Sequence, residues 1–205
     1  MPLVIRDESI ISEINALWLP IYPHMAEHLL AVSGFGGRGG GTFLDLGPFA
    51  GGMAVAVLRV YEACAATVID ESAPVLRWAE EQAVAGGCAS RLATRRLPLD
   101  PIPEPDASFD LVAVRGAFFF LTPSLLGEVR RVLRPGGFGW VGGGYGPTTP
   151  AEVIAPIAER SKVLNEAIGK QRITPADAQA MVEAAGLDDC ARVVTEGGLW
   201  IEVRA

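Results

Sequence analysis

The sequence predicts an α/β fold in which a mostly parallel sheet carries helices on both faces. Two observations support this prediction. From Thr42 onward, short apolar runs alternate with segments of helical periodicity, which is the pattern of strands joined by crossover helices. The chain holds seven strand-like runs, and the last two, in "ARVVTEGGLWIEVRA", flank a glycine turn.

The order of the elements follows from proline positions and apolar periodicity. The segment 8–33 is expected to be helical in two pieces, because Pro20 and Pro23 interrupt its apolar pattern. Thr122 before Pro123 predicts a helix start, since threonine caps a helix and proline is tolerated at its first position. The other expected elements are strands at 42–46, 66–70, 91–96, 109–114 and 137–142, and helices at 51–65, 73–85, 151–169 and from 174 onward; the helix that starts at Thr122 stops at Pro135.

Length and charge restrict the class of protein. A chain of 205 residues with half of them hydrophobic is long enough for one well-buried domain and too short for two comfortable ones. The net charge of -7, from 17 basic and 24 acidic residues, gives no basic face for a phosphate backbone. Nucleic acid is therefore a disfavoured partner.

Cysteine usage and the N-terminal sequence point to a cellular location. Cys64, Cys88 and Cys190 lie far apart without C-x-x-C spacing, so neither a disulfide framework nor a thiolate metal site is expected. The start "MPLVIRDESI" has no basic segment before an apolar core, and no apolar run approaches the length of a membrane span. We expect a cytoplasmic protein without a membrane span or a bound metal.

Two glycine clusters compete for the ligand site. "GFGGRGGG" at 34–41 has the dinucleotide spacing G-x-G-x-x-G, but it precedes the first strand and is expected to be a flexible connector. "FLDLGPFAGG" at 43–52 leaves a strand and enters a helix, where the ligand crevice of an open parallel sheet lies. Phe49 stands where a dinucleotide fingerprint has the glycine that lets backbone approach a diphosphate. The loop therefore suits a nucleoside without phosphates.

An acid near the end of the second strand would complete such a site. Asp70 lies where the carboxylate that binds ribose hydroxyls is expected. The alternative is that Asp70 only caps the next helix, a role that Ser72 could fill equally well.

With these motifs in order, the chain resembles the Rossmann-like (class I) S-adenosylmethionine-dependent methyltransferases, most closely their small-molecule branch. The resemblance runs from about 42 to 204 and rests on "FLDLGPFAGG", "VIDESAPVLRWAEE", "PIPEPDASFDLVAVRGAFFFL", "EVRRVLRPGGFGWVGG" and the closing strand pair. It implies a seven-stranded sheet with an antiparallel last strand, and S-adenosylmethionine as cofactor. On this basis 42–205 is one methyltransferase domain, and 1–41 comprises N-terminal helices and a glycine-rich connector that cover the site.

The resemblance also implies roles for particular residues. Asp45, Gly47 and Gly51 would shape the pocket for the methionine portion, Asp70 would accept hydrogen bonds from ribose, and Leu97 would line the adenine. The complete set of implied cofactor-binding residues is Asp45, Gly47, Phe49, Gly51, Asp70, Glu71, Leu97 and Arg115. Phe49, Glu71 and either Arg96 or Leu97 depart from the family's usual residues, which predicts rearranged recognition of the cofactor or a lower affinity for it.

Candidate residues on the acceptor side come from two regions. The methyl group of a sulfonium is already activated, so no universal catalytic residue is required, although a base helps when the acceptor is a hydroxyl or a carbon acid. His24 and His28 lie four apart on one predicted helix face beside Tyr22; an ordinary half-buried surface pair is the alternative. Tyr145 lies in the glycine-rich loop after the fifth strand, where it either touches an acceptor or is a turn residue.

An apolar wall for the acceptor pocket is expected from "AFFFL" at 117–121. Phe119 or Phe120 could provide it, with core packing as the alternative for most of these phenylalanines.

Together, the candidate residues favour an enzyme that transfers a methyl group in line to a small, partly apolar metabolite. A degenerate cofactor-binding protein without turnover is the first alternative, and protein methylation is another. A nicotinamide-dependent oxidoreductase is disfavoured by Phe49. Neither the acceptor nor the oligomeric state has a signature in the sequence.

Overall fold

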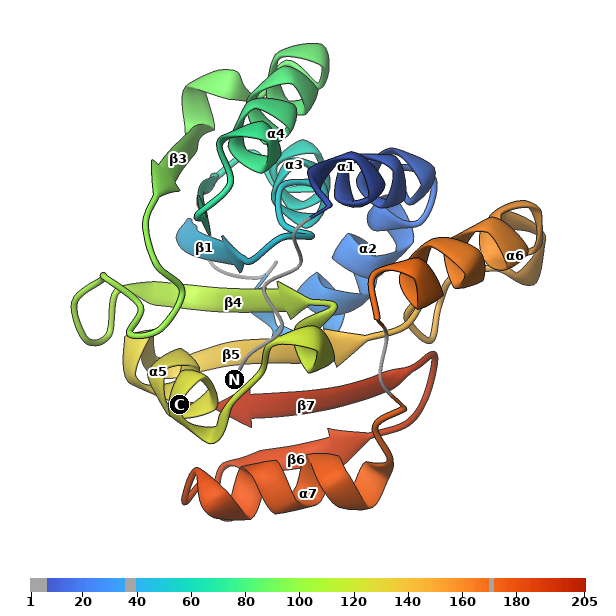
Figure 1. The fold of residues 1–205 in the computed structure, drawn as a ribbon. Coiled ribbons are helices and arrows are strands. Elements are labelled where there is room, and N and C mark those ends of the chain that lie inside the picture. The colour runs from blue at the N-terminus through green and yellow to red at the C-terminus, as the bar shows by residue number, and fades with distance from the viewer. Residues whose placement is uncertain (1–6, 36–39, 170–171) are drawn as a thin grey trace.

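Seven strands form one sheet in the computed structural model of the chain, which describes residues 7–35, 40–169 and 172–205 (Figure 1). The strand order is β3-β2-β1-β4-β5-β7-β6. Strands β1 to β5 pair in parallel, whereas β7 is antiparallel to both of its neighbours, β5 and β6. The predicted fold class, a mostly parallel seven-stranded sheet with an antiparallel last strand, is confirmed.

The bounds of the elements follow the expected order along the chain. The strands are β1 Gly41–Leu46, β2 Cys64–Asp70, β3 Leu92–Arg96, β4 Phe109–Arg115, β5 Leu133–Gly143, β6 Ala191–Val194 and β7 Leu199–Arg204. The helices are α1 Glu8–Leu17, α2 Tyr22–Ser33, α3 Gly52–Val60, α4 Ala73–Ala85, α5 Pro123–Val132, α6 Ala151–Ala167 and α7 Pro175–Ala184, with a short 3-10 helix at Ala117–Phe119. None of the helices in the described residues has the length and apolarity needed to cross a membrane.

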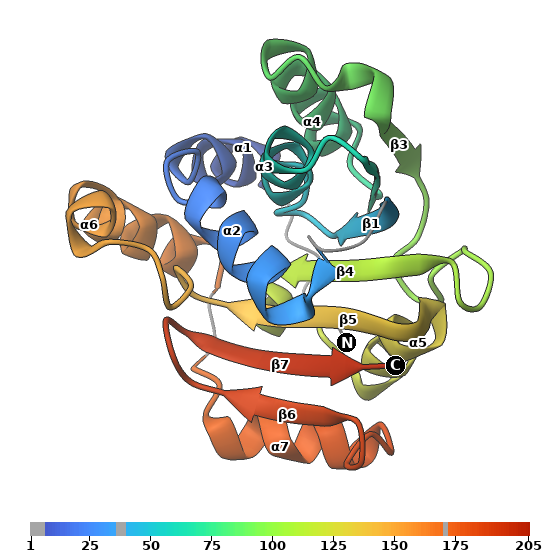
Figure 2. The ribbon, with the colours of Figure 1, turned by 180° about the vertical axis from the view of Figure 1, so that it is seen from behind.

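The sheet separates two hydrophobic cores. Successive side chains of a strand point to opposite faces, so β5 supplies Trp140 to one core and Val141 to the other. Helices α1, α2, α3, α4 and α6 contribute to the first core, and α5 and α7 to the second. Figures 1 and 2 show α5 and α2 over opposite faces of β4 and β5.

The N-terminal helices share the first core with the sheet. Ile11 and Ile14 of α1 and Met25 and Leu29 of α2 are fully buried there. Pro23 lies in the first turn of α2, where proline is tolerated, so the two pieces expected from the prolines are separate helices. Most of the predicted glycine-rich connector, 36–39, lies outside the described residues. The division at residue 41 stays a prediction.

Side-chain caps explain where several helices begin. The Thr122 hydroxyl accepts a hydrogen bond from Leu125 N at 3.0 Å, as expected for the start of α5. Thr174 and Asp177 form a reciprocal capping box at the start of α7. Ser72 caps α4, so the helix start does not depend on Asp70.

The two largest differences between predicted and observed boundaries have a structural cause. Helix α3 ends at Val60 rather than at 65, where Arg91 donates hydrogen bonds to the carbonyl oxygens of Leu58 and Tyr61. Strand β5 begins at Leu133 rather than at 137, because Leu133 pairs with Phe109 before the register of the β4–β5 ladder shifts. Both causes are contacts between distant segments.

A pair of identical substitutions tests the second core. Val129 in α5 is completely buried, whereas Val84 in α4 is 70% exposed. Val129→Ala should lower the free energy of unfolding by about 2 kcal/mol, because buried methyl groups are lost and a cavity remains. Val84→Ala should change it by less than about 0.5 kcal/mol. Urea denaturation measures both, and equal effects would contradict the assignment of Val129 to a packed core.

Candidate active site

The carboxyl ends of the parallel strands bring the predicted site residues to one edge of the sheet. Strand β1 leads into the loop that contains Gly47, β2 ends at Asp70, and β4 ends at Arg115. The Gly47 amide bonds the carbonyl oxygen of Ile69 at 3.0 Å, which ties the first loop to the end of β2. This edge is where ligands bind in open α/β sheets.

Asp45 holds the glycine loop from inside the protein. Its Oδ2 accepts hydrogen bonds from the backbone amides of Gly51 at 2.7 Å and Ala54 at 2.9 Å, while Oδ1 has no partner among the described residues. Burial raises the pKa of Asp45 to about 6, and these two hydrogen bonds oppose the shift. Gly47 has a φ of 101°, a conformation that glycine adopts without strain. Asp45 therefore sets the shape of the loop and has no exposed surface of its own.

Asp70 lies at the end of β2 with one carboxylate oxygen in use. Its Oδ1 accepts a hydrogen bond from Ser72 N at 2.7 Å, and its Oδ2 makes no hydrogen bond among the described residues. Burial raises the pKa of Asp70 to about 6, with smaller contributions from Glu71 and Glu8. The Ser72 hydroxyl donates to Glu8 Oε1 at 2.8 Å, so the start of α1 lies beside this carboxylate.

Leu97 and Glu71 lie close to Asp70. The Leu97 amide donates to the carbonyl oxygen of Asp70 at 3.3 Å, and the Leu97 side chain is half-buried. The Glu71 side chain is exposed, and its carbonyl oxygen accepts a hydrogen bond from Arg96 Nε at 2.8 Å. The structure thus brings these two predicted residues to the same end of the site as Asp70.

Arg115 joins the strand edge to the N-terminal helices. Its Nη2 donates to Tyr22 Oη at 2.6 Å, to Asn15 Oδ1 at 2.7 Å and to the carbonyl oxygen of Phe49 at 3.2 Å. The guanidinium also lies 4.7 Å from the ring centroid of Trp18. Only 4% of Arg115 is exposed, and burial lowers its pKa while the nearby Tyr22 and Asp45 oppose that shift.

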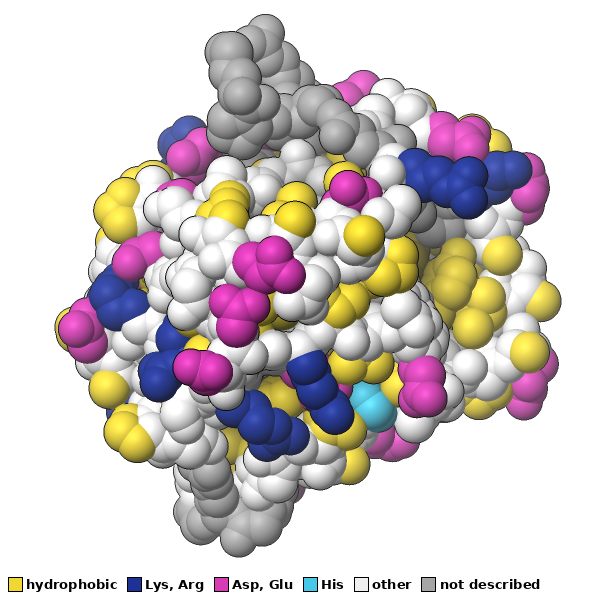
Figure 3. Space-filling model, turned by 90° about the horizontal axis from the view of Figure 1, so that it is seen from below, with side chains coloured by type: hydrophobic (Ala, Val, Ile, Leu, Met, Phe, Trp, Pro, Cys, Tyr) yellow, Lys and Arg dark blue, Asp and Glu magenta, His cyan; other side chains and the backbone are white. Residues whose placement is uncertain are grey.

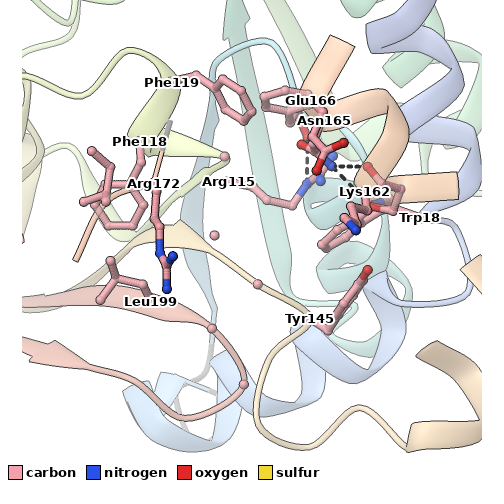
Figure 4. Close-up of a pocket in the computed structure, with 18 residues that line it drawn as sticks. Trp18, Arg115, Phe118, Phe119, Tyr145, Lys162, Asn165, Glu166, Arg172 and Leu199 are labelled. Atoms are coloured by element: carbon pink, nitrogen blue, oxygen red, sulfur yellow. Dashed lines mark hydrogen bonds between the residues drawn. The ribbon is translucent and has the colours of Figure 1, made fainter. Parts of the chain in front are cut away.

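A cavity of about 660 Å³ lies beyond the ends of β4 and β5 (Figure 4). Arg115, Gly116 and Phe49 form the wall nearest the glycine loop. Residues of α1, α6, the β5–α6 loop and the turn before β7 close the other sides. The described lining residues are Trp18, Phe49, Arg115, Gly116, Phe118, Phe119, Gly143, Gly144, Tyr145, Ser161, Lys162, Asn165, Glu166, Arg172, Ile173, Gly197, Gly198 and Leu199. The volume suits a small organic molecule.

The fold of this site is shared with solved methyltransferase structures. A protein of Methanococcus maripaludis assigned as an S-adenosylmethionine-dependent methyltransferase superimposes with a TM-score of 0.77 at 21% identity, covering 100% of this chain and 94% of its own. An S-adenosylmethionine-dependent methyltransferase of Aquifex aeolicus gives 0.65 at 19% identity, covering 96% of each chain. An O-methyltransferase family protein of Burkholderia thailandensis gives 0.63 at 19% identity, covering 98% of this chain and 61% of its own.

The sequence itself matches a family model described as "Methyltransferase domain" over residues 43–137. This range holds the glycine loop, Asp70 and Arg115. This match covers just under half of the chain, and the fold around it is that of solved S-adenosylmethionine-dependent methyltransferases. The expected family and cofactor are thereby confirmed. No curated protein matches the sequence of this chain.

The residues at the Asp70 end of the site fit this cofactor. Asp70 offers a carboxylate oxygen that has no hydrogen-bond partner among the described residues, as ribose hydroxyls require, and Leu97 lies beside it. At the other end, aromatic rings crowd the loop: a Cβ on Gly47 would lie 2.7 Å from the Phe120 ring, and one on Gly116 would lie 2.4 Å from the Phe49 ring. Phe49, which replaces the usual glycine, thus packs against the chain that follows β4.

The predicted acceptor-side residues separate into two groups. Tyr145 and Phe119 line the cavity, and Tyr145 stacks on Trp18 at 4.8 Å between ring centroids. Phe120 is not among the described lining residues, because its ring lies against Gly47. The Tyr22 hydroxyl is buried on Arg115, and burial raises its pKa to about 12.

The two histidines lie away from the cavity. They are half-buried on α2, and the cavity's described lining includes neither of them. The ring of His28 lies 5.5 Å from that of Trp140, over the face of the sheet, and burial lowers the His28 pKa. The carbonyl oxygen of His24 accepts a hydrogen bond from the Thr148 hydroxyl at 3.2 Å.

Several residues that build the site have no signature in the sequence. Asn15 belongs to α1, Trp18 directly follows that helix, and Ser161, Lys162 and Glu166 belong to α6. Trp18 Nε1 donates to the Ser161 hydroxyl at 3.0 Å, which joins these two helices across the cavity. The apolar periodicity of these segments predicts helices, but no sequence motif shows which helix faces enclose the cavity.

The Asp70 pKa generates a prediction about cofactor binding. Ribose hydroxyls donate to a carboxylate, so Asp70 must lose its proton to accept both hydrogen bonds. Because its pKa is raised to about 6, the affinity for S-adenosylhomocysteine should rise as the pH increases toward 6 and level off above it. The limiting slope is about tenfold per pH unit.

Asp70→Asn provides the control, since an amide does not titrate in this range. Calorimetric titration between about pH 5 and pH 7.5 should show a much smaller pH dependence for this variant than for the unmodified protein. Equal slopes in the two proteins would contradict the role of Asp70.

Proposed function

We propose that this methyltransferase methylates a small, partly apolar metabolite that occupies the cavity beside Tyr145. The observation that carries the proposal is a shared wall: Phe49, Arg115 and Gly116 border both the glycine loop and the cavity. A molecule in the cavity would therefore lie next to the cofactor edge of the sheet. Such proximity is the main contribution that a protein makes to this reaction.

For the cofactor half, we propose the residues implied by the family motifs. Asp70 accepts hydrogen bonds from the ribose hydroxyls, and Leu97 lines the adenine. Asp45 holds the glycine loop in shape through its hydrogen bonds to Gly51 and Ala54. The proposed cofactor-binding set is Asp45, Gly47, Phe49, Gly51, Asp70, Glu71, Leu97 and Arg115, the last through its main chain. When bound, S-adenosylmethionine supplies a methyl group already activated by the sulfonium.

For the acceptor half, we propose that Trp18, Phe119 and Tyr145 hold the apolar body of the acceptor. Trp18 and Tyr145 stack with an interplanar angle of 20°, and the Trp18 indole is fixed by Ser161. A stacked and hydrogen-bonded pair presents a rigid wall, which favours a flat molecule. Of the candidates Tyr22, His24, His28 and Tyr145, we favour Tyr145 for contact with the reacting group, since it lines the cavity.

A small-molecule acceptor also agrees with the charge distribution. On the face seen in Figure 3, Lys and Arg side chains form small groups among Asp and Glu side chains. Such a mixed surface does not favour a nucleic-acid backbone as partner. We further propose a cytoplasmic location, supported by the free cysteines Cys64, Cys88 and Cys190.

A second candidate function is cofactor binding without turnover. The Phe120 ring lies on Gly47, where the methionine portion is expected, and the Phe49 ring lies on Gly116 directly after β4, which favours this alternative. The two functions differ in product formation. Both predict S-adenosylhomocysteine binding that depends on Asp70, and only the first predicts a methylated product.

The cavity assignment can be tested by filling it. Leu199 lines the cavity, whereas Val163 of α6 is 45% exposed and lies outside the lining. Phenols, amines, thiols and organic acids would first be offered with S-adenosylmethionine, and the methylated product measured by mass spectrometry. Leu199→Trp should lower the rate of product formation by at least about tenfold, because the indole occupies acceptor volume.

Cofactor affinity separates a blocked acceptor from a damaged fold. The affinity of Leu199→Trp for S-adenosylhomocysteine should stay within about threefold of that of the unmodified protein. Val163→Trp should match the unmodified protein in both the rate of product formation and this affinity. An unchanged rate in Leu199→Trp would contradict the cavity as acceptor site. Binding without any product from the offered acceptors would favour the second function.

A further inference from the structure

One side of the cavity is formed by the buried cation of Arg115, which makes no ion pair with a carboxylate of the described residues. The groups that accept hydrogen bonds from Arg115 are the Asn15 amide, the Tyr22 hydroxyl and the Phe49 carbonyl, all of them neutral. Within the described residues no carboxylate forms an ion pair with it. The Asp45 carboxylate favours the charged guanidinium from nearby without forming an ion pair with it, so a group of opposite charge in the cavity would stabilise the buried cation further.

One nitrogen of this guanidinium is open to the cavity. Nη1 makes no hydrogen bond among the described residues. In the described residues, the fully buried side-chain atoms that lack a hydrogen-bond partner are Asp45 Oδ1 and Trp200 Nε1. Nη1 is not one of them, so it is not fully buried. Since Arg115 lines the cavity, Nη1 is the part of the side chain that a ligand there can reach.

The charge of the described lining is opposite to that of the chain. Arg115, Lys162 and Arg172 face the cavity with Glu166 as the single acid, a net charge of +2 in a protein of net charge -7. Lys162 and Arg172 make no ion pair within the described residues. Figure 4 shows Lys162 near Trp18, and Arg172 beside Leu199. Cations converging on one cavity favour an anionic ligand.

The walls near Arg115 are aromatic. The ring centroids of Phe49 and Phe119 are 5.6 Å apart, and the guanidinium lies 5.1 Å from the Phe49 ring and 4.7 Å from the Trp18 ring. Tyr145 continues this surface by stacking on Trp18. The same cavity therefore offers flat apolar surfaces and a fixed cation, which together match a planar ring that carries an acid group.

We propose that the acceptor is a planar aromatic acid whose carboxylate binds Arg115 Nη1 and whose ring lies against the aromatic wall of the cavity. This inference rests on the proposed function and specifies its substrate class. The alternative ligand for Arg115 Nη1 is the carboxylate of the cofactor itself. The acceptor is favoured because Asp70, Gly47 and Leu97 are not among the described residues that line this cavity.

Binding of matched acids and amides tests the proposal. The full chain is saturated with S-adenosylhomocysteine and titrated by calorimetry with benzoate, 4-hydroxybenzoate and 4-hydroxycinnamate, each compared with its carboxamide. At least one acid should bind about tenfold more tightly than its amide, since the shapes match and only the charge differs. Equal affinities in every acid–amide pair would overturn the proposal.

Variants assign the preference to Arg115. Arg115→Met should abolish the preference for the acid, Arg115→Lys should retain part of it, and Lys162→Met should reduce it about threefold. The matched control is Arg160→Met on the same helix as Lys162, since Arg160 is 53% exposed, pairs with Glu13 and does not line the cavity. It should leave the preference unchanged.

The two carboxylate sources give different results. If Arg115 binds the acceptor, the preference for the acid falls by a larger factor than the affinity for S-adenosylhomocysteine in both Arg115 variants. Loss of that affinity with an unchanged acid preference would assign Arg115 to the cofactor and overturn the proposal. If Arg115→Met fails to fold, Arg115→Lys and Lys162→Met still decide, since an unaltered acid preference in both contradicts the assignment.

Failure of the underlying function has a separate signature. An unmodified protein that does not bind S-adenosylhomocysteine would contradict the proposed function. Cofactor binding without any acid preference would leave that function standing and contradict only the substrate class.

Discussion

The hydrogen bonds of the Arg115 guanidinium connect four parts of the molecule. The side chain leaves the end of β4 and bonds Asn15 of α1, Tyr22 of α2 and the carbonyl oxygen of Phe49 in the glycine loop. A buried cation needs such acceptors, so the N-terminal helices must pack on the site for it to remain inside the protein. Those contacts place Trp18 above the guanidinium and form one wall of the cavity. The cofactor edge and the acceptor cavity are therefore built around one side chain.

The features that sequence could predict are those encoded locally. The alternation of apolar runs with helical segments predicts the parallel sheet, because buried parallel strands are short continuous apolar runs and their connections have helical periodicity. The helix start at Thr122 follows from the capping chemistry of one residue and the proline after it. Asp70 could be predicted to lie near the glycine loop because both follow parallel strands, whose carboxyl ends meet at one edge of the sheet.

The remaining features depend on contacts between distant segments. Spacing placed His24 and His28 on one face of α2, but only packing shows that His28 faces Trp140 of the sheet. The side chain of Arg115 could not be assigned from its neighbours in sequence, since its partners come from positions up to 100 residues away. Trp18 and Ser161, 143 residues apart, meet across the cavity without any motif around either residue. Acceptor recognition in this fold is thus a tertiary property, whereas cofactor recognition is largely a local one.

A crystal structure of the protein with bound S-adenosylhomocysteine would test the account most directly. We predict that the ribose hydroxyls contact the free oxygen of Asp70 and that the thioether sulfur faces the cavity lined by Arg115 and Tyr145. Phe120 should then have left its position on Gly47. Density for the ligand away from Asp70, or a sulfur that faces away from this cavity, would contradict the proposal that the two halves of the site share the wall at Arg115.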